Sequence, residues 1–348
     1  MGPKQKLFRL FLLGAGAIAS ILVLFFITQN YNDRRNNFVR LFPPHIAWLQ
    51  DELDLGVNSF YIAGTTDQNI FLGNTTTPAY ITRSNIDRID TSRFRVMIAP
   101  DTKILYDKGQ YSIDSPYINL VDLVSRKMLM TSNPNDKLYP VALPQLLIAQ
   151  TVLLNQADIV CRTYDVKADR AYLKKYAITQ NEPASTLELP KQSEGLFSPD
   201  GNLIYDAVKK QLVYVFRYKN QFLVIDTNLQ LIKANRTLDT NTFAKVQRVY
   251  IASQNKMTMS KPPVVVNASS ALWNGLLFIK SPLLSSNENR SSFKNNEPID
   301  IYNTNTGAYL YSFYLPKFKG STCREFTVRK NKLLALYDHY LLSFHLRL

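Results

Sequence analysis

Four short apolar runs follow one another in Gly195-Leu-Phe-Ser-Pro-Asp-Gly-Asn-Leu-Ile-Tyr-Asp206, Gln211-Leu-Val-Tyr-Val-Phe216, Gln221-Phe-Leu-Val-Ile-Asp226 and Leu231-Ile-Lys-Ala234. Runs of this length, rich in β-branched and aromatic residues and divided by polar turns, are typical of consecutive antiparallel strands. The turn Pro199-Asp200-Gly201 has a physical basis, because Pro presets φ, Asp caps the backbone and Gly accepts a positive φ. This stretch predicts a meander of three or four strands.

The same pattern continues over the chain from about residue 50. Similar runs recur roughly every ten residues, for example at 59–63, 69–73, 79–83 and 93–98. Two segments, Tyr117-Ile-Asn-Leu-Val-Asp-Leu-Val-Ser-Arg-Lys-Met-Leu129 and Ile299-Asp-Ile-Tyr-Asn-Thr-Asn-Thr-Gly-Ala-Tyr-Leu-Tyr311, repeat the order strand, polar turn, strand. Repetition at a period of a few dozen residues is typical of a β-propeller, in which each blade is a four-stranded meander.

One segment also resembles a known family. Phe197-Ser-Pro-Asp-Gly-Asn-Leu-Ile-Tyr205 resembles the blade motif of TolB-like propellers, and Ser59-Phe-Tyr-Ile-Ala-Gly64 with Asn69-Ile-Phe-Leu-Gly-Asn74 resembles an opening blade of such proteins. The resemblance covers the architecture and implies no activity, because propellers host many functions. Roughly 300 residues at about 45 per blade give six blades, with five and seven as alternatives. We therefore expect an all-β fold, a six-bladed β-propeller.

An unbroken apolar run at residues 10–27 precedes this domain. As a helix the run would cover roughly 27 Å, close to the thickness of a bilayer core. We interpret residues 1–9 as a short basic tail, 10–28 as a transmembrane signal anchor, 29–49 as a juxtamembrane spacer and 50–348 as the propeller. A cleaved signal peptide is the alternative, but the small residues Ala15, Ala17 and Ala19 lie inside the run and leave a poor cleavage site.

The flanking charges do not orient the anchor. Three basic residues precede the run and three follow it, namely Lys4, Lys6, Arg9, Arg34, Arg35 and Arg40. The short basic tail is typical of an export signal, and long domains cross largely regardless of charge. We expect a single-pass membrane protein with its large domain in the periplasm or outside the cell. Spacings such as Ala15 with Ala19 make a helix-mediated dimer a minor alternative.

Charge and cysteine content limit the partners. The net charge is +14, from 41 basic and 27 acidic residues. These charges are interleaved rather than gathered in blocks, which argues against nucleic-acid binding. Cys161 and Cys323 would form one disulfide in an oxidising compartment, and two buried free thiols are the alternative.

No catalytic, cofactor or metal residue can be assigned. The chain has three histidines, and His45 lies in the spacer, so the domain cannot assemble a multi-histidine metal or haem site. His339 and His345 share strand parity near Asp338, but structural histidines in a terminal strand are the favoured interpretation. The sequence has no G-x-S-x-G elbow, P-loop or EF-hand loop.

Two functions remain. The first is a non-catalytic binding or scaffold module for a protein or an envelope component. The alternative is a glycan hydrolase or lyase, which requires two carboxylates about 5 to 10 Å apart in the central channel. A sensor of a signalling system is disfavoured because too few residues precede the anchor for an output domain.

The last blade requires a strand from elsewhere. The chain ends with three strand-like runs, Arg324-Glu-Phe-Thr-Val328, Lys332-Leu-Leu-Ala-Leu-Tyr337 and Tyr340-Leu-Leu-Ser-Phe-His-Leu346. An open edge would be a template for aggregation, and propellers avoid it by pairing the two termini. We expect residues 52–57 to supply the fourth strand.

Overall fold

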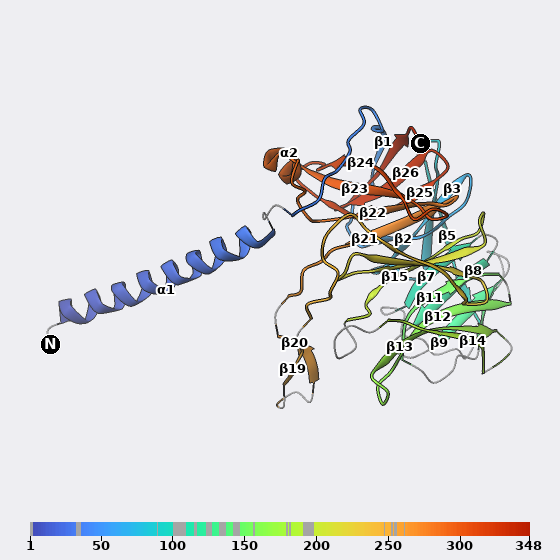
Figure 1. Cartoon of the computed structure of the whole chain (residues 1–348), viewed down its shortest axis with the longest axis horizontal. Helices are drawn as coiled ribbons and strands as arrows, with labels where there is room; N and C mark the ends of the chain where they lie inside the picture. Colours follow the sequence, from blue (N-terminus) through green and yellow to red (C-terminus); the bar gives the residue numbers. More distant parts are fainter. Residues whose placement is uncertain are drawn as a thin grey trace.

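The structure, a computed structural model, describes residues 3–32, 36–88, 90–99, 109–114, 117–122, 127–131, 137–141, 147–155, 157–178, 180, 182–190, 198–246, 248–251, 253, 256–260 and 262–348. Within these ranges a long helix, α1 (Pro3–Asn32), projects from the body of the molecule (Figure 1). The β-propeller that follows it has six blades around a central cavity. The predicted all-β, six-bladed fold is confirmed.

The first three blades follow the chain order. They contain β2 (Phe60–Thr65), β3 (Asn69–Asn74), β4 (Tyr80–Asn85) and β5 (Thr91–Arg95); β7 (Gly109–Asp114), β8 (Tyr117–Asp122), β9 (Lys127–Thr131) and β10 (Lys137–Val141); and β11 (Leu147–Leu153), β12 (Asp158–Asp165), β13 (Arg170–Ala177) and β14 (Pro183–Glu188). The short β6 (Met97–Ile98) adds a fifth strand to blade 2, parallel to β10. Each first strand is innermost.

The remaining blades repeat this order until the ring closes. They contain β15 (Gly201–Asp206), β16 (Gln211–Phe216), β17 (Gln221–Asp226) and β18 (Leu231–Arg236); β21 (Ser269–Trp273), β22 (Leu276–Lys280), β23 (Asn296–Asn303) and β24 (Tyr309–Pro316); and β25 (Cys323–Arg329), β26 (Lys332–Tyr337), β27 (Tyr340–Leu346) and β1 (Ala47–Asp54). A hairpin, β19 (Arg248–Ile251) and β20 (Lys256–Met259), interrupts the connection between blades 4 and 5. The short α2 (Arg290–Asn295) precedes β23.

Blade 4 is the meander predicted from residues 195–234, and it shows how alternation builds the core. Every side chain of β16 is buried. Because successive side chains point to opposite faces, Leu212, Tyr214 and Phe216 pack toward blade 3, whereas Val213 and Val215 pack toward blade 5. The strand therefore fills two seams at once. Residues 195–197 and 123–126 of the sequence motifs lie outside the described residues.

Ring closure occurs as expected, with one difference. β1 pairs antiparallel with β27, and Glu52 and Asp54 lie opposite Leu342 and Tyr340. The strand begins at Ala47 rather than at residue 52, so the end of the predicted spacer belongs to the blade. Sequence pattern missed this part because β1 is an edge strand whose side chains are mostly exposed, which leaves no alternating apolar signal.

The helix α1 extends away from the propeller (Figure 1). Its described apolar side chains are largely exposed, including Phe11 and Leu13. Among the described residues, no helix combines the length and apolarity that a membrane crossing requires. The anchor at residues 10–28 stays a prediction.

The two cysteines lie in different blades. Cys161 is on β12 of blade 3 and Cys323 on β25 of blade 6, and they belong to separate hydrophobic clusters. Both thiols are free and buried in the structure. Burial raises the pKa of each thiol to about 12.

Candidate binding site

The central channel is lined by the innermost strand of each blade, β2, β7, β11, β15, β21 and β25, around a cavity of about 350 Å³. Its polar side chains bond to one another across the blades. Gln150 Nε2 donates to Asn202 Oδ1 at 2.9 Å, and Asn202 Nδ2 donates to Ser270 Oγ at 3.0 Å. Gln150 Oε1 also accepts from the backbone N–H of Leu203 at 2.9 Å. These contacts join blades 3, 4 and 5 and use polar groups that a ligand would otherwise meet.

The channel offers one carboxylate among its described lining residues, that of Asp206. Both oxygens of this carboxylate accept hydrogen bonds from backbone N–H groups in turns. Its Oδ1 accepts from the N–H groups of Val208 and Lys209 at 3.0 and 3.2 Å, and its Oδ2 accepts from Gly275 N–H at 2.7 Å. The pair of carboxylates that glycoside hydrolysis requires is therefore not found in the described part of the lining.

A second cavity, of about 510 Å³, lies where blades 4 and 5 meet the chain that leaves α1. We call it the groove. Polar groups are supplied by Asn36, Arg217 and Asn241, while its walls are mainly apolar and come from Pro262, Pro263, Val264, Val265, Ala268, Pro282 and Leu283. Its size and its mixture of apolar walls with a few polar groups are typical of binding pockets.

The groove borders a segment, residues 36–42, that we call the strap. At its centre Arg40 is buried, with 1% of its surface exposed. The guanidinium binds Asp300 through two contacts, Nε to Oδ1 at 2.7 Å and Nη2 to Oδ2 at 3.1 Å. Its Nη1 donates to Glu288 Oε2 at 2.5 Å and to the carbonyl oxygen of Leu283 at 2.7 Å. A planar guanidinium matches this set of acceptors, which a lysine ammonium could not.

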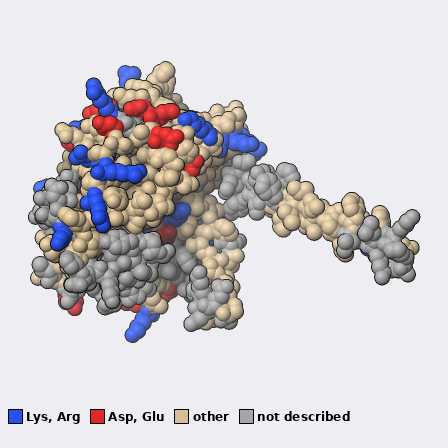
Figure 2. All heavy atoms as spheres, turned by 180° about the vertical axis from the view of Figure 1, so that it is seen from behind, with Lys and Arg blue, Asp and Glu red and all other residues tan. Residues whose placement is uncertain are grey.

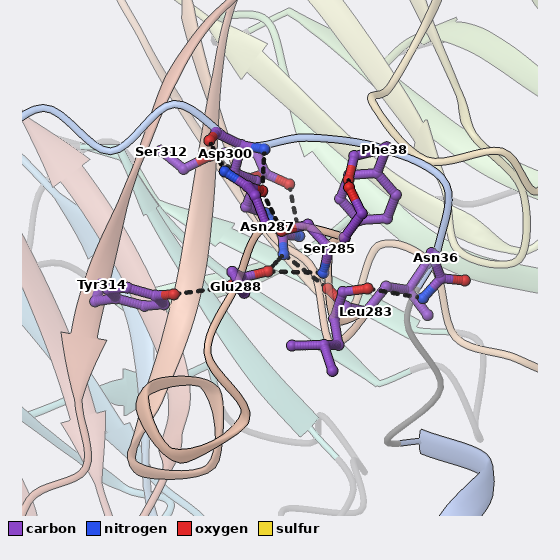
Figure 3. Close-up of polar contacts among 12 residues, drawn as sticks. Asn36, Phe38, Leu283, Ser285, Asn287, Glu288, Asp300, Ser312 and Tyr314 are labelled. Carbon is purple, nitrogen blue, oxygen red and sulfur yellow. Dashed lines mark hydrogen bonds and ion pairs between the residues drawn. The ribbon is translucent and has the colours of Figure 1, made fainter.

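The two carboxylates are satisfied by further donors (Figure 3). Glu288 accepts from the N–H of Ser285 and from the hydroxyl of Tyr314, both at 2.8 Å. Asp300 Oδ1 accepts from Ser312 Oγ at 2.5 Å. Burial alone would lower the pKa of Arg40, but the facing carboxylates outweigh it and raise the pKa above its ordinary value. Arg40 is therefore charged at any physiological pH.

Contacts on both sides of Arg40 hold the rest of the strap on blade 5. The side-chain amide of Asn36 donates to the carbonyl oxygen of Leu284 at 3.0 Å. Phe38 packs in a small cluster with Val266 and Leu283. Phe42 stacks on Tyr314 with ring centroids 4.3 Å apart. The chain is therefore fixed to the propeller from Asn36 onward.

The sequence pattern places the strap in the predicted spacer at residues 29–49, with Arg40 as one of the charges that flank the predicted anchor. A local signal was present, since Arg40 stands alone between apolar residues in Phe38-Val-Arg-Leu-Phe42. That pattern is typical of a strand with one inward charge, and such a charge requires a buried partner. Nothing in the sequence identifies Asp300 as that partner.

The predicted histidines are not brought together as a site. His339 lies in the β26–β27 turn beside Asp338, with Nδ1 and Oδ2 3.0 Å apart. His345 is on β27 and its ring packs against Trp48 of β1 at 4.4 Å. His45 is exposed before β1. Across the described ranges, no group of three potential metal ligands is found.

Among the described residues, one buried amine contacts an aromatic ring rather than a hydrogen-bond acceptor. Lys219 lies in the β16–β17 turn with 1% of its surface exposed, and its Nζ makes no hydrogen bond to any group in the described structure. The ammonium lies 3.7 Å from the centroid of the Phe216 ring. Burial lowers the pKa of Lys219 to about 8.

The outer surface carries mixed charge. On the face shown in Figure 2, Lys and Arg side chains are scattered among Asp and Glu rather than gathered in a block. This distribution agrees with the interleaved charges of the sequence.

Comparisons with known proteins identify similar folds and no relative by sequence. The sequence matches no protein-family model and no curated protein. A member of the DUF4221 family from Bacteroides vulgatus aligns with a TM-score of 0.52 and 12% identity, covering 90% of this chain and 99% of that one. A streptogramin B lyase gives a TM-score of 0.49 at 11% identity over 87% of this chain and 98% of that one. At such identities the DUF4221 likeness shows the fold alone, which is the propeller already described.

Proposed function

We propose that this chain is a membrane-tethered, non-catalytic propeller that binds a protein or an envelope component in the groove. The strap is the observation that carries the proposal. A linker between a membrane helix and an independent domain needs no buried contacts, whereas here Arg40 and its carboxylates fix the linker to blade 5. The groove lies directly beside this attachment, because Asn36 and Leu283 belong to both.

The tether itself is proposed from the sequence. Residues 10–27 are apolar, and those side chains of α1 that the structure describes are mostly exposed, as expected of a helix that requires a lipid environment. We place the propeller in the periplasm or outside the cell. The resemblance of residues 197–205 to TolB-like blades supports a propeller of that type as a further part of the proposal.

The glycan-active alternative has less support. Its site would lie in the channel, where the described lining has one carboxylate, that of Asp206. This carboxylate already accepts hydrogen bonds from the backbone of two turns. Loops, in contrast, form the groove, and loops on a rigid scaffold are where propellers and other folds place binding residues.

Site-specific photo-crosslinking tests the proposal. A benzophenone amino acid at Asn241, inside the groove, should give an adduct of one defined mass in cells that make the protein. The matched control is the same probe at the exposed Asn228, in the β17–β18 turn at the other end of blade 4. Pro262→Arg, which places a long side chain in the groove from an exposed position, should remove the adduct. Equal adducts at both sites, or none at Asn241, would refute binding in the groove.

A further inference from the structure

One wall of the groove is an extended segment, residues 262–266, that we call the crossing segment. Val264 and Val266 pack in the same hydrophobic cluster as the strap. Val265, between them, packs in a different cluster with Tyr218 of the β16–β17 turn. Side chains that alternate between two sides in this way are the geometry of a β-strand. The two prolines that begin the segment favour the same extended backbone, because each ring fixes φ and restricts the residue before it.

Most backbone groups of the crossing segment have no hydrogen-bond partner within the described structure. The N–H of Val266 donates to the carbonyl oxygen of Arg217 at 2.9 Å. The N–H groups of Val264 and Val265 and the carbonyl oxygens of residues 263–265 make no bond to any described residue. These three residues line the groove and are partly exposed. An extended backbone with free N–H and C=O groups is the kind of edge on which another chain can pair.

Arg217 gives the groove a positive charge that no described carboxylate neutralises. It is the one charged side chain among the described lining residues, and its Nη1 donates to the carbonyl oxygen of Ala268 at 3.2 Å. Asp200 lies close by, since its carbonyl oxygen accepts from the N–H of Arg217, but its carboxylate pairs with Arg162 at 2.9 Å. A guanidinium in this state matches a carboxylate ligand, which can accept two parallel N–H bonds.

The size and the neutral groups of the groove limit its occupant further. Its volume of about 510 Å³ takes a few residues of an extended chain rather than the surface of a folded domain. Asn241 donates from Nδ2 to Asp239 Oδ1 at 3.2 Å, and its side-chain oxygen accepts no bond from described residues. That oxygen can therefore receive an N–H group of the occupant.

We propose that the groove binds an extended segment of a partner protein, which pairs with the crossing segment as an added strand and places an Asp or Glu side chain on Arg217. The inference rests on the proposed function and names the class of partner for that site. Bonds between the two main chains supply affinity in this mode of recognition, and the side-chain contacts supply selectivity.

Peptide selection on the full-length protein in detergent supplies the probe. We expect peptides selected from a random heptapeptide library on phage to share one Asp or Glu at a fixed position, with apolar side chains at alternate positions. A selected peptide is then synthesised with a fluorophore, and its Kd is measured by fluorescence polarisation. Pro262→Arg, which obstructs the groove, should abolish binding. Enrichment of Lys or Arg in place of the acidic residue would overturn the proposal.

Two substitutions test the ion pair. Arg217→Gln, and replacement of the peptide's acidic residue by its amide, should each lower the affinity about tenfold or more, because a charge-assisted hydrogen bond is lost. Together they should cost little more than either alone, since both remove the same contact. Losses that multiply would overturn the role of Arg217. The peptide substitution is measured on the wild-type protein, so this arm does not depend on how Arg217→Gln folds. The matched control Arg93→Gln removes an exposed charge from blade 1 and should leave Kd unchanged.

Backbone methylation of the peptide tests the added strand. A methyl group on alternate backbone nitrogens should weaken binding about fivefold or more, whereas a methyl group on the intervening nitrogens should have little effect. The reason is that only alternate N–H groups of a strand face the neighbouring strand. Equal losses at every position, or none at any, would overturn strand addition.

The outcomes are separable from those of the proposed function. A photo-adduct at Asn241 in cells, with no selected peptide that loses binding in Pro262→Arg, would overturn the peptide and leave binding in the groove intact. If dodecanoate binds in the groove and no peptide does, the occupant is an acyl carboxylate and the peptide proposal is again overturned. If neither an adduct nor a groove-binding ligand is found, both proposals fall.

Discussion

Replacing Arg40 with alanine should destabilise the whole propeller, because two buried carboxylates would lose the guanidinium that pairs with both of them. Asp300 and Glu288 expose 2% and 3% of their surfaces, so neither can turn to water without opening blade 5. Breaking a buried ion pair in this way costs about 3–5 kcal/mol. For a domain of this size, the midpoint of thermal unfolding should fall by roughly 5–8 °C.

Calorimetry on the purified full-length protein in detergent measures this shift. The matched control is Arg93→Ala, which removes an exposed arginine of β5 and should change the free energy of unfolding by no more than about 0.5 kcal/mol. A second variant, Arg40→Met/Glu288→Gln/Asp300→Asn, removes all three charges and should recover much of the loss, because no uncompensated charge stays buried.

The strap should also become accessible in Arg40→Ala. Limited proteolysis should then cut between Asn36 and His45, which the wild-type protein protects. If Arg40→Ala melts within one degree of the wild type and resists cleavage there, the strap does not hold the chain on blade 5.

Three further results are expected. Deleting residues 340–348 removes β27 from between β1 and β26, so the domain should lose cooperative unfolding altogether; a truncated protein that melts near the wild type would show that closure is not required. Lys219 binds its proton less tightly in the folded state, so between about pH 8 and its unfolded pKa near 10.5 the unfolded state holds more protons. The free energy of unfolding should therefore rise with pH across this window, by about 3 kcal/mol relative to Lys219→Met. Parallel pH profiles of the two proteins would contradict this. Cys161 and Cys323 should react with a thiol reagent only after denaturation, and without prior reduction. If no thiol reacts in denaturant until a reductant is added, the two cysteines form a disulfide instead.

The parts of the fold that could be predicted depend on local pattern. Blade 4 was predicted because β15 to β18 alternate regularly and are joined by turns whose residues have fixed backbone preferences. The closing strand was predicted from the open edge that three C-terminal runs would leave. Both arguments use neighbours in sequence or a general property of sheets.

The strap and the groove could not be predicted because they depend on contacts between distant residues. Arg40 and Asp300 are 260 positions apart, and neither is unusual by itself. The same holds for Gln150 and Asn202, whose bond joins two blades. The β19–β20 hairpin could not be predicted for a different reason. Its neighbouring residues Val249 and Tyr250 are both exposed, so this run lacks the alternation of a half-buried strand.

Topology in intact cells tests the tethered propeller most directly. A cysteine introduced at Asn228 is exposed, and the two native thiols are buried, so a maleimide that cannot cross the cytoplasmic membrane reports on one position. We predict that this cysteine is labelled in intact cells and that the labelled protein stays in the membrane pellet after extraction with alkaline carbonate. Labelling that requires lysis would place the propeller in the cytoplasm, and release of the protein by carbonate would show that it has no membrane anchor.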